Sequence, residues 1–354
     1  MNPTAVEKDE RLSPSPPVAD PGETRVTVDD LESSNEGSDR GFEEEQTREL
    51  MVDPMALTQS SPTVAEKGAP LFTIAYGVRT HTGLVRDHNE DDYLILEDQG
   101  VYLVADGMGG HAAGKVASKI CVDTCEKYFQ ELNGTSDENT NGLSVSAAEF
   151  ENSLRSANRA IFDASNTDPA LSGMGTTAVG LRIQGDMVAI CHAGDSRCYL
   201  VRQGRLRQVT VDHSLSNFLL AMGREAEARL AEATMSNVIM RALGLEPDVV
   251  IDTQEFAVRI GDRLMLCSDG LSDLVPQVRI ERMLTDPALD RETVAENLLQ
   301  AALEAGGRDN ITVLIVDVVD RILATEDDDT GPATRVASDL HDTFEQTAPG
   351  ITGE

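Results

Sequence analysis

The sequence has no tryptophan, and aromatic residues make up only 4% of its 354 positions. Because hydrophobic residues still reach 40%, a core must be built mainly from Ala, Val, Leu and Ile. Basic residues are scarce as well: 29 Lys and Arg face 62 Asp and Glu, which gives a formal net charge of −33. Since this charge would repel a polyanion, the composition argues against binding to nucleic acid or to an anionic membrane.

Long apolar runs are absent. The longest, Ile311–Val319, is interrupted by Asp317 and is far shorter than the roughly 20 residues of a membrane-spanning helix. The N-terminal residues MNPTAVEKDER are too polar for a signal peptide. We therefore expect a cytoplasmic protein that does not contact a membrane.

Cysteine is used sparingly and without pattern. The five residues are Cys121, Cys125, Cys191, Cys198 and Cys267. Their number is odd, and they form neither a CxxC pair nor a Cys/His cluster at zinc spacing, which argues against a disulfide framework or a structural zinc site. We interpret all five as buried apolar residues.

Composition divides the chain into three parts. Residues 1–69, rich in Glu, Asp, Ser, Pro and Thr, hold 16 acidic and 6 basic residues, and residues 325–354 hold 8 acidic residues and 1 basic residue. Neither segment can bury enough apolar surface to offset its chain entropy, so we predict that both are disordered acidic tails. The stretch 70–324 is apolar in a regular pattern and is predicted to be one domain of about 250 residues.

Strand and helix patterns alternate within this domain. The expected strands are Leu71–Arg79, Asp92–Glu97, Val101–Ala105, Thr176–Ile183, Met187–His192, Arg197–Arg202, Gln208–Thr210, Val249–Ala257, Arg263–Cys267 and Ile311–Val319. The expected helices are His111–Leu132, Ala147–Ser165, with Ser144 or Ser146 as its cap, Pro276–Leu284 and Glu292–Ala305. Many strands with inserted helix pairs favour an α+β fold in which helices cover antiparallel sheets.

Acidic residues beside Gly or Asn stand at the ends of several expected strands. They are Glu90 and Asp91, Asp106 before Gly107, Asp269 before Gly270, and Asp309 before Asn310. One such acid is usually a turn or cap residue, but four sites in one chain favour a partner that offsets their desolvation. Mg²⁺ or Mn²⁺ fits this role, and two such ions can share a carboxylate and acidify a bridging water toward a bound phosphate. Gly107 would leave its own carbonyl free to approach a metal.

Arg86 and His111 are candidates for phosphate binding and acid catalysis. Arg86 stands four residues before Glu90, and its guanidinium matches two oxygens of a phosphate dianion, although a surface ion pair is an equally ordinary role. His111 ends the glycine-rich turn after Asp106 and could protonate a leaving alkoxide. The alternative for His111 is a helix N-terminal residue without a catalytic role.

Eight segments, in this order, resemble the successive motifs of the metal-dependent protein phosphatase family (PPM, type 2C) in its bacterial form. They are residues 83–91, 104–114, 173–177, 193–197, 212–215, 241–244, 266–271 and 308–312. The resemblance implies a four-layer αββα sandwich, with two five-stranded antiparallel sheets between helix pairs and a two-metal site at one edge. It also implies that residues 212–244 form a mobile flap beside that site.

Site roles follow from the resemblance residue by residue. Asp106 would bridge both metals, the Gly107 carbonyl would bind one, and Asp269 and Asp309 would complete the other. Glu90 would bind a metal directly or through water, Asp91 would orient a metal-bound water, and Arg86 would hold the phosphoryl group. Asp195 resembles the acid that joins Asp269 at a third metal site. His111 departs from the animal pattern, in which the proposed acid directly follows the Asp-Gly pair, because it stands five residues after Asp106.

These inferences together predict a protein Ser/Thr phosphatase that uses Mn²⁺ or Mg²⁺ and attacks phosphorus with a metal-bridging hydroxide. Its partners would be proteins phosphorylated on Ser or Thr, including a cognate kinase. One alternative is a phosphatase dedicated to a single regulator of the anti-sigma antagonist type. Two others are a phosphoprotein-binding pseudophosphatase and a docking role carried by the acidic tails.

Overall fold

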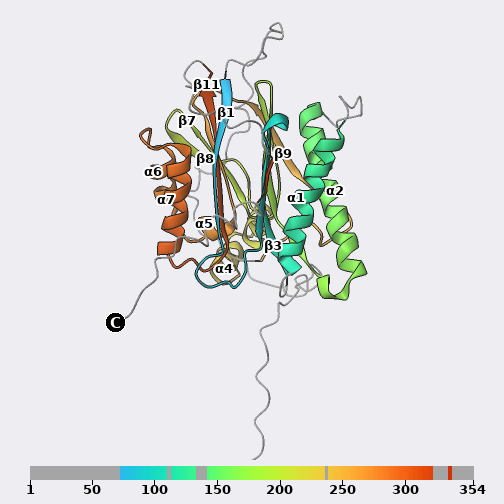
Figure 1. Ribbon diagram of the computed structural model, residues 1–354. Coiled ribbons are helices and arrows are strands. Elements are labelled where there is room, and N and C mark those ends of the chain that lie inside the picture. The colour runs from blue at the N-terminus through green and yellow to red at the C-terminus, as the bar shows by residue number, and fades with distance from the viewer. Residues whose placement is uncertain (1–71, 110–112, 133–141, 236–237, 322–333, 337–354) are drawn as a thin grey trace, which may run out of the picture. The chain divides into compact units, whose positions relative to one another are not determined.

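The computed structural model describes residues 72–109, 113–132, 142–235, 238–321 and 334–336. The predicted tails, 1–69 and 325–354, lie outside these residues except for 334–336. Those three residues form a strand, so the prediction of disorder is wrong for them, and for the rest of both tails it stays a prediction. The described residues form two antiparallel β-sheets that are flanked by helices on both outer faces (Figure 1). This arrangement confirms the α+β sandwich.

The first sheet has the strand order β1-β11-β10-β7-β8. Its strands are β1 (Phe72–His81), β11 (Ile311–Asp320), β10 (Arg263–Cys267), β7 (Arg197–Arg202) and β8 (Arg205–Gln208). We expected the last strand at Gln208–Thr210, but it begins earlier because Gln203 and Gly204, both with positive φ, form a tight two-residue turn directly after β7.

The second sheet has the order β12-β2-β3-β5-β6-β9, with β4 paired to β3 alone. Its strands are β2 (Asp91–Leu96), β3 (Val101–Met108), β4 (Gly175–Thr176), β5 (Ala178–Gln184), β6 (Met187–Ala193), β9 (Asp252–Ala257) and β12 (Thr334–Val336). It therefore has seven strands where the family resemblance implied five. The two short strands β4 and β12 account for the difference, and β12 adds three residues from beyond the predicted domain to the edge of β2.

The alternation of side chains along each strand builds the layers. In β11, Leu314 and Val316 lie in the core between the two sheets, whereas Val313 and Ile315 face the helices on the outside of the first sheet. Both faces of this strand are buried, so its sequence is apolar almost throughout.

Helix pairs cover the outer faces of both sheets. The pair on the second sheet is α1 (Ala113–Glu131) and α2 (Val145–Thr167), and α6 (Gln277–Leu284) and α7 (Arg291–Glu304) cover the first sheet. The expected cap of α2 is confirmed, because the Ser144 side chain accepts a hydrogen bond from the Ala147 amide at 3.1 Å.

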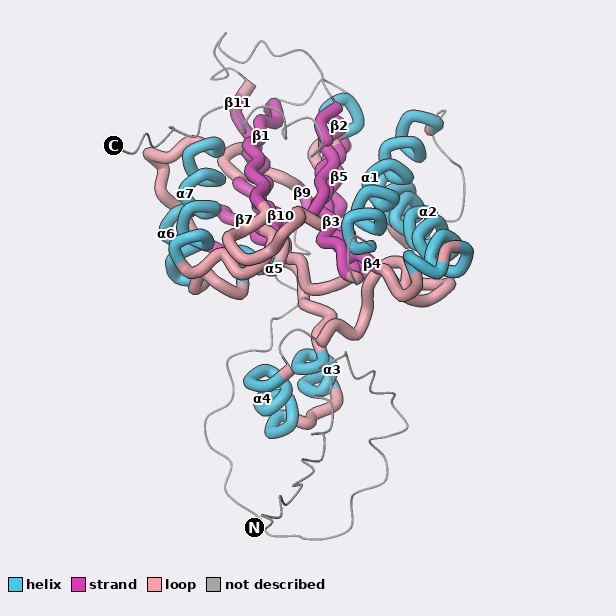
Figure 2. Tube along the Cα trace, turned by 60° about the horizontal axis from the view of Figure 1, so that its bottom comes forward, coloured by secondary structure: helices cyan, strands magenta, loops and turns pink. Residues whose placement is uncertain are grey.

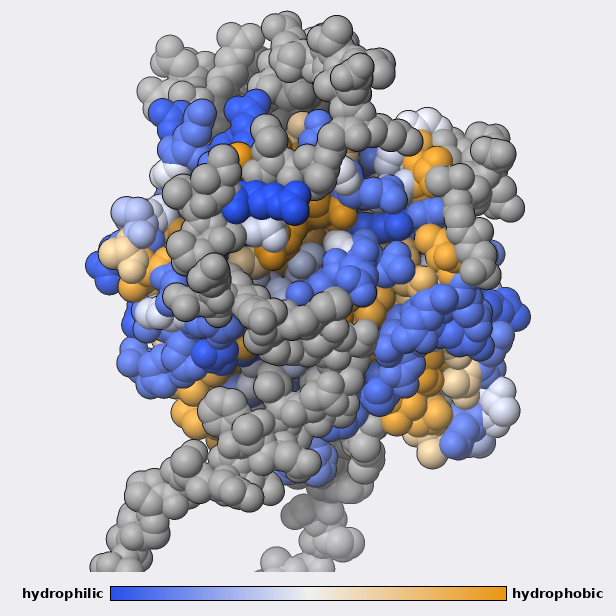
Figure 3. Space-filling model, turned by 45° about the horizontal axis from the view of Figure 1, so that its top comes forward, coloured by the Kyte–Doolittle hydropathy of each residue, from blue (hydrophilic) through white to orange (hydrophobic). Residues whose placement is uncertain are grey.

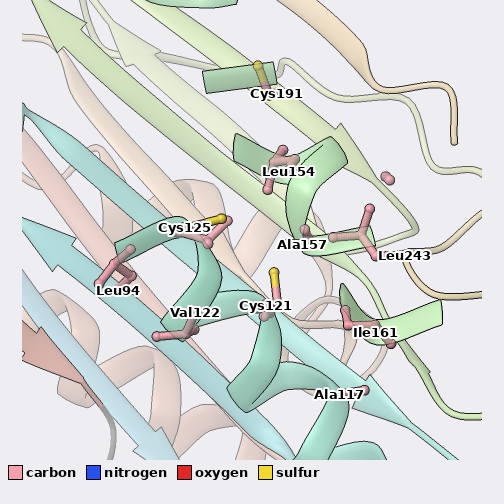
Figure 4. Packing of buried hydrophobic residues seen from close by; sticks show 14 of the residues in the cluster. Leu94, Ala117, Cys121, Val122, Cys125, Leu154, Ala157, Ile161, Cys191 and Leu243 are labelled. Atoms are coloured by element: carbon pink, nitrogen blue, oxygen red, sulfur yellow. The ribbon is translucent and has the colours of Figure 1, made fainter. Parts of the chain in front are cut away.

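All five cysteines are buried free thiols, as predicted. Cys121 and Cys125 of α1 and Cys191 of β6 belong to the cluster that packs α1 and α2 against the second sheet (Figure 4). Figure 3 shows mainly hydrophilic residues on the visible surface of the described part, with smaller apolar patches among them. No helix among the described residues is both long enough and apolar enough to cross a membrane.

The segment 212–244 forms two short helices, α3 (Leu215–Ala221) and α4 (Glu225–Thr234). They pack on a small apolar cluster of their own, made of Leu219, Ala228 and Ala231. Figure 2 shows this pair beyond the ends of the strands, connected to the sandwich by loops. We call residues 212–244 the flap.

Candidate metal centre

Asp91 and Asp106 face each other at one end of the β2–β3 pair. They are direct register partners on the two antiparallel strands, so their side chains leave the same face of the sheet. Next to Asp106, the Gly107 amide donates a hydrogen bond to the Glu90 carbonyl at 3.2 Å. Three of the predicted metal-binding acids, including Glu90, are thus placed together by one strand pair.

The first sheet brings Asp269 and Asp309 to the same edge. Strand β10 ends at Cys267, just before the short helix α5 (Asp269–Ser272), and Asp309 stands two residues before β11. Because β10 and β11 are antiparallel neighbours, the end of one lies beside the start of the other. The carboxylates from both sheets interact, since Asp269 and Asp309 both raise the pKa of Asp106 after the effect of burial.

Two hydroxyl groups of the first sheet hold Asp91 of the second. Ser268 Oγ and Thr312 Oγ1 donate hydrogen bonds to Asp91 Oδ2 at 2.8 and 2.7 Å. Ser268 and Thr312 are themselves paired, with an N–O distance of 3.1 Å between the Ser268 amide and the Thr312 carbonyl. This bridge fixes one Asp91 oxygen and joins the two sheets at the edge that carries Asp91, Asp106, Asp269 and Asp309. We call this edge the carboxylate edge.

Asn310 connects the loop before β2 to the start of β11. Its Oδ1 accepts a hydrogen bond from the Glu90 amide at 2.8 Å, and its Nδ2 donates to the carbonyls of Thr82 and His88 at 2.8 and 2.9 Å. The loop that carries Arg86 is therefore closed onto the carboxylate edge by one amide side chain.

Arg86 lies at this edge, as predicted. Its Nη2 donates to Asp309 Oδ2 at 2.8 Å, while 53% of the Arg86 side chain stays exposed. Gly83, with φ of +84°, lets the loop pass the Asp309 backbone, because a Cβ on Gly83 would overlap the Asp309 carbonyl. A half-exposed guanidinium thus stands beside the carboxylate cluster.

Three carboxylate oxygens at this edge are buried and have no hydrogen-bond partner within the described residues. They are Glu90 Oε1, Asp91 Oδ1 and Asp195 Oδ1. Buried acceptors without donors are costly, and hard divalent cations take carboxylate oxygens as ligands. The residues present therefore fit a divalent metal centre.

Burial, and after it the neighbouring carboxylates, raises the pKa values of Asp91, Asp106, Asp195 and Asp269. Burial is the main cause for Asp91 and Asp195, each of which has its pKa raised to about 6. The pKa values of Asp106 and Asp269 are raised well above their usual range, first by burial and then by neighbouring carboxylates. Such values mark a site that is electrostatically unfavourable until positive charge is added.

Asp273 belongs to the cluster but was missed in the sequence. It follows Asp269 by one helical turn and, with Asp195, raises the pKa of Asp269, where burial is the largest cause. The spacing of four residues could have indicated this, because residues four apart share a helix face. Ser268 and Thr312 were also missed, since their contact with Asp91 depends on the packing of the two sheets.

His111 lies outside the described residues, so its predicted acid role stays untested. Within the described part of the chain, the three metal-ligand side chains whose donor atoms all lie within 4.8 Å of one another are His192, His213 and Asp252, which are not the predicted acids. Mg²⁺ and Mn²⁺ would keep several waters when bound, so a site for them would not require three protein ligand atoms this close to one another.

Metal-free protein is expected to lose stability as the pH rises from about 4 to 7. The unfolded carboxylates ionise near pH 4, whereas Asp91 and Asp195 ionise in the folded protein only near pH 6. A pKa raised by folding gives stability that is present below the unfolded value and lost as pH passes the folded value. Melting temperatures with EDTA and with millimolar Mn²⁺ should therefore diverge between pH 4.5 and 7. A constant difference would contradict the electrostatic account.

An αββα sandwich with a carboxylate cluster at one edge defines the class of metal-dependent phosphatases that the sequence motifs resemble. The family model described as protein phosphatase 2C matches residues 82–305. The serine/threonine phosphatase stp of Listeria monocytogenes is 37% identical over 244 residues, which cover 68% of this chain and 94% of that protein. The chain belongs to the protein phosphatase 2C family.

Mycobacterial relatives support the same assignment. The serine/threonine protein phosphatase PstP of Mycobacterium tuberculosis is 37% identical over 250 residues, covering 70% of this chain and 46% of that protein. A crystal structure of PstP has a TM-score of 0.61 at 35% identity and covers 70% of this chain and 99% of that chain. The PstP catalytic domain in complex with two manganese ions has a TM-score of 0.59 at 36% identity and covers 70% of this chain and 100% of that chain.

Proposed function

We propose that this protein hydrolyses phosphoserine and phosphothreonine in other proteins with the help of Mn²⁺ or Mg²⁺. The observation that carries the proposal is the carboxylate edge, where acids of both sheets converge around unpartnered buried oxygens beside an exposed Arg86. Relatives of this chain carry the name serine/threonine phosphatase, and the structure of one of them was determined with two manganese ions. All the acids of the predicted ligand set are present, which disfavours a pseudophosphatase.

The acids divide the work of metal binding. Asp106, whose pKa is raised by burial and then by Asp91, Asp269, Asp195 and Asp309, is the acid that we propose to serve two cations, and Asp309 and Glu90 complete the set. The Gly107 carbonyl is the further proposed ligand, and Asp195 with Asp269 is the proposed weaker third site. When bound, the cations supply Lewis-acid chemistry and lower the pKa of water near phosphorus.

The remaining residues position the substrate and the attacking water. Asp91, fixed through Oδ2 by Ser268 and Thr312, keeps Oδ1 free to accept a hydrogen bond from a water at the site. Arg86 is exposed enough to exchange its contact with Asp309 for two phosphoryl oxygens. The cysteines are buried thiols, which supports direct hydrolysis without a cysteinyl-phosphate intermediate.

The substrate range, cognate kinase and cytoplasmic location are parts of the same proposal. The second candidate is a phosphatase dedicated to a single phosphorylated regulator. Comparing the rate of dephosphorylation of such a regulator with that of various kinase-phosphorylated proteins would separate the two candidates. The acidic tails 1–69 and 325–354, apart from the β12 residues 334–336 that pair with β2, are proposed to lie outside the catalytic domain. Partner pull-downs with and without residues 1–69 would test a docking role for the N-terminal tail.

Full-length protein is expected to hydrolyse p-nitrophenyl phosphate and phosphothreonine peptides with Mn²⁺ and to lose this activity in EDTA. The physical reason is that the buried carboxylates repel a phosphate dianion until divalent cations offset their charge, and these cations also lower the pKa of the attacking water. Phosphate release with and without added Mn²⁺ measures this. Turnover that is undiminished in the chelator would refute the metal-dependent function.

Arg86→Ala is expected to lower kcat/KM for a phosphopeptide by about 10- to 100-fold. This range corresponds to loss of one charged hydrogen-bonding group, about 1.5–3 kcal/mol. Arg86→Lys should recover only part of the activity, because an ammonium cannot bind two oxygens as a planar fork. The matched control is Arg229→Ala, since that side chain is exposed on α4 of the flap. Unchanged steady-state kinetics in Arg86→Ala would exclude phosphate binding by this residue.

A further inference from the structure

The flap is joined to the sandwich by a cluster of polar side chains at its base. His213, the second residue of the flap, lies between Arg241, near the flap's end, and Asp252 of β9. Arg241 Nη1 donates to Asp252 Oδ1 at 2.5 Å and lies 2.9 Å from His213 Nε2. The His213 ring also stacks on His192 of β6, with ring centroids 4.6 Å apart.

This cluster resembles a metal site in composition but not in bonding. His192 Nε2 contacts the Val211 carbonyl at 2.9 Å, and His213 Nδ1 accepts a hydrogen bond from the Gly194 amide at 3.0 Å. The Arg241 guanidinium already places a positive charge against Asp252. The cluster has its own cation, and three of its four ring nitrogens already have contacts, so we interpret it as a structural anchor.

His213 contacts the turn that carries Asp195 through two hydrogen bonds. Its amide donates to the Gly194 carbonyl at 2.9 Å, while its Nδ1 accepts from the Gly194 amide. The preceding flap residue, Asp212, forms a bidentate ion pair with Arg197, at distances of 2.7 to 3.1 Å. Gly194 directly before Asp195 and Arg197 two residues after it are therefore bound to the first two residues of the flap.

The turn that carries Asp195 is also connected to Asp106 by hydrogen bonds. Ser196 and Thr177 share a hydroxyl hydrogen bond of 2.7 Å, and the Asp106 amide donates to Thr177 Oγ1 at 3.3 Å. Gly194, with φ of +119°, packs so closely on Thr177 that a Cβ would lie 2.5 Å from the threonine Cβ. The other end of the flap joins here too, because Leu243 pairs with Thr176.

We propose that His213, held by Asp252, which Arg241 binds in turn, is a positioning residue that makes the flap base and the Asp195 turn move as one unit. Flap position and cation binding at Asp195 are then coupled. This inference rests on the proposed function because it requires the proposed metal ions, but it does not require that the protein turn over a substrate. Coupling is reciprocal: if flap closure favours the cation, the cation must favour flap closure to the same extent.

Hydrogen exchange of the full-length protein tests the coupling without measuring catalysis. In the wild type, Mn²⁺ should slow exchange of the α3 and α4 amides. In Asp195→Asn, which keeps Asp106 and Asp309, this slowing should be lost. His213→Ala should speed flap exchange and weaken the lowest-affinity Mn²⁺ site by about three- to tenfold, the range for one lost hydrogen bond. Calorimetric titration measures that site directly.

A conservative variant separates positioning from simple destabilisation. His213→Asn can place its side-chain oxygen near the position of Nδ1 and should keep the Gly194 contact, so it should restore much of the Mn²⁺ affinity. Arg241→Gln, like His213→Ala, should speed flap exchange and weaken the lowest-affinity Mn²⁺ site. The control Arg202→Gln breaks an ion pair with Asp262 away from the flap and should change neither quantity. Equal slowing of flap exchange by Mn²⁺ in wild type, Asp195→Asn and His213→Ala would overturn the coupling. Coupling without phosphatase activity would instead refute the proposed function alone.

Discussion

Asp106→Asn is expected to lower kcat by at least about 10³-fold and, in the same protein, to raise the melting temperature of the metal-free form. The catalytic loss follows from removing a central metal-binding charge, because a bound cation contributes several kcal/mol and each 1.4 kcal/mol is about tenfold in rate. Phosphate release at saturating Mn²⁺ measures this change.

The gain in stability has the opposite electrostatic origin. Burial and the neighbouring Asp91 and Asp269 raise the pKa of Asp106 well above its usual range, so the ionised side chain destabilises the metal-free fold at neutral pH. A neutral amide of nearly the same shape removes that repulsion. The variant should therefore melt higher than the wild type in EDTA and gain less from Mn²⁺.

The opposite signs of the two effects make the prediction specific. A residue that merely supports the fold would lower both activity and stability. Asp98→Asn is the matched control, because Asp98 is exposed at the other end of the β2–β3 pair and should change neither quantity. An Asp106→Asn protein that melts lower than the wild type in EDTA, or that keeps its turnover, would exclude Asp106 from the metal centre.

Sequence patterns predicted the parts of this molecule that depend on neighbours along the chain. A nearly continuous apolar run located β11, and of the acids at strand ends Asp91 and Asp106 lie together as register partners. From the sequence we interpreted Gly107 as a glycine that leaves its own carbonyl free to approach a metal. The structure adds a steric reason for glycine at this position. A Cβ there would overlap the Gly114 carbonyl, so the residue is small because α1 begins directly against the end of β3.

Contacts between distant segments could not be predicted in this way. The hydroxyls of Ser268 and Thr312 meet Asp91 only because the two sheets pack face to face. The same holds for His213, whose partners come from β9 and from the far end of the flap. Strand β12 was missed because three residues in an acidic segment give too short a pattern to indicate pairing with β2.

Arg182 illustrates a buried contact whose loss should have the largest effect on stability. It lies in β5 beneath α1 and α2, where its Nη1 is 2.5 Å from Glu149 Oε2 and its guanidinium is 4.8 Å from the Phe129 ring centroid. The two charged side chains are only 3% and 5% exposed. Removing one partner leaves a buried charge without compensation, which costs about 3–5 kcal/mol.

Arg182→Met is accordingly expected to lower the free energy of unfolding by about 3–5 kcal/mol, measured by urea denaturation. The double variant Arg182→Met/Glu149→Leu should recover most of that loss, because an apolar pair of similar volume has no charge to desolvate. Both proteins should keep near wild-type kcat under conditions where they are folded, since Arg182 lies at the opposite end of β5 from the carboxylate edge. A double variant less stable than the single one would show that the ion pair itself, and not the avoidance of an unpaired charge, stabilises the contact between the helices and the second sheet.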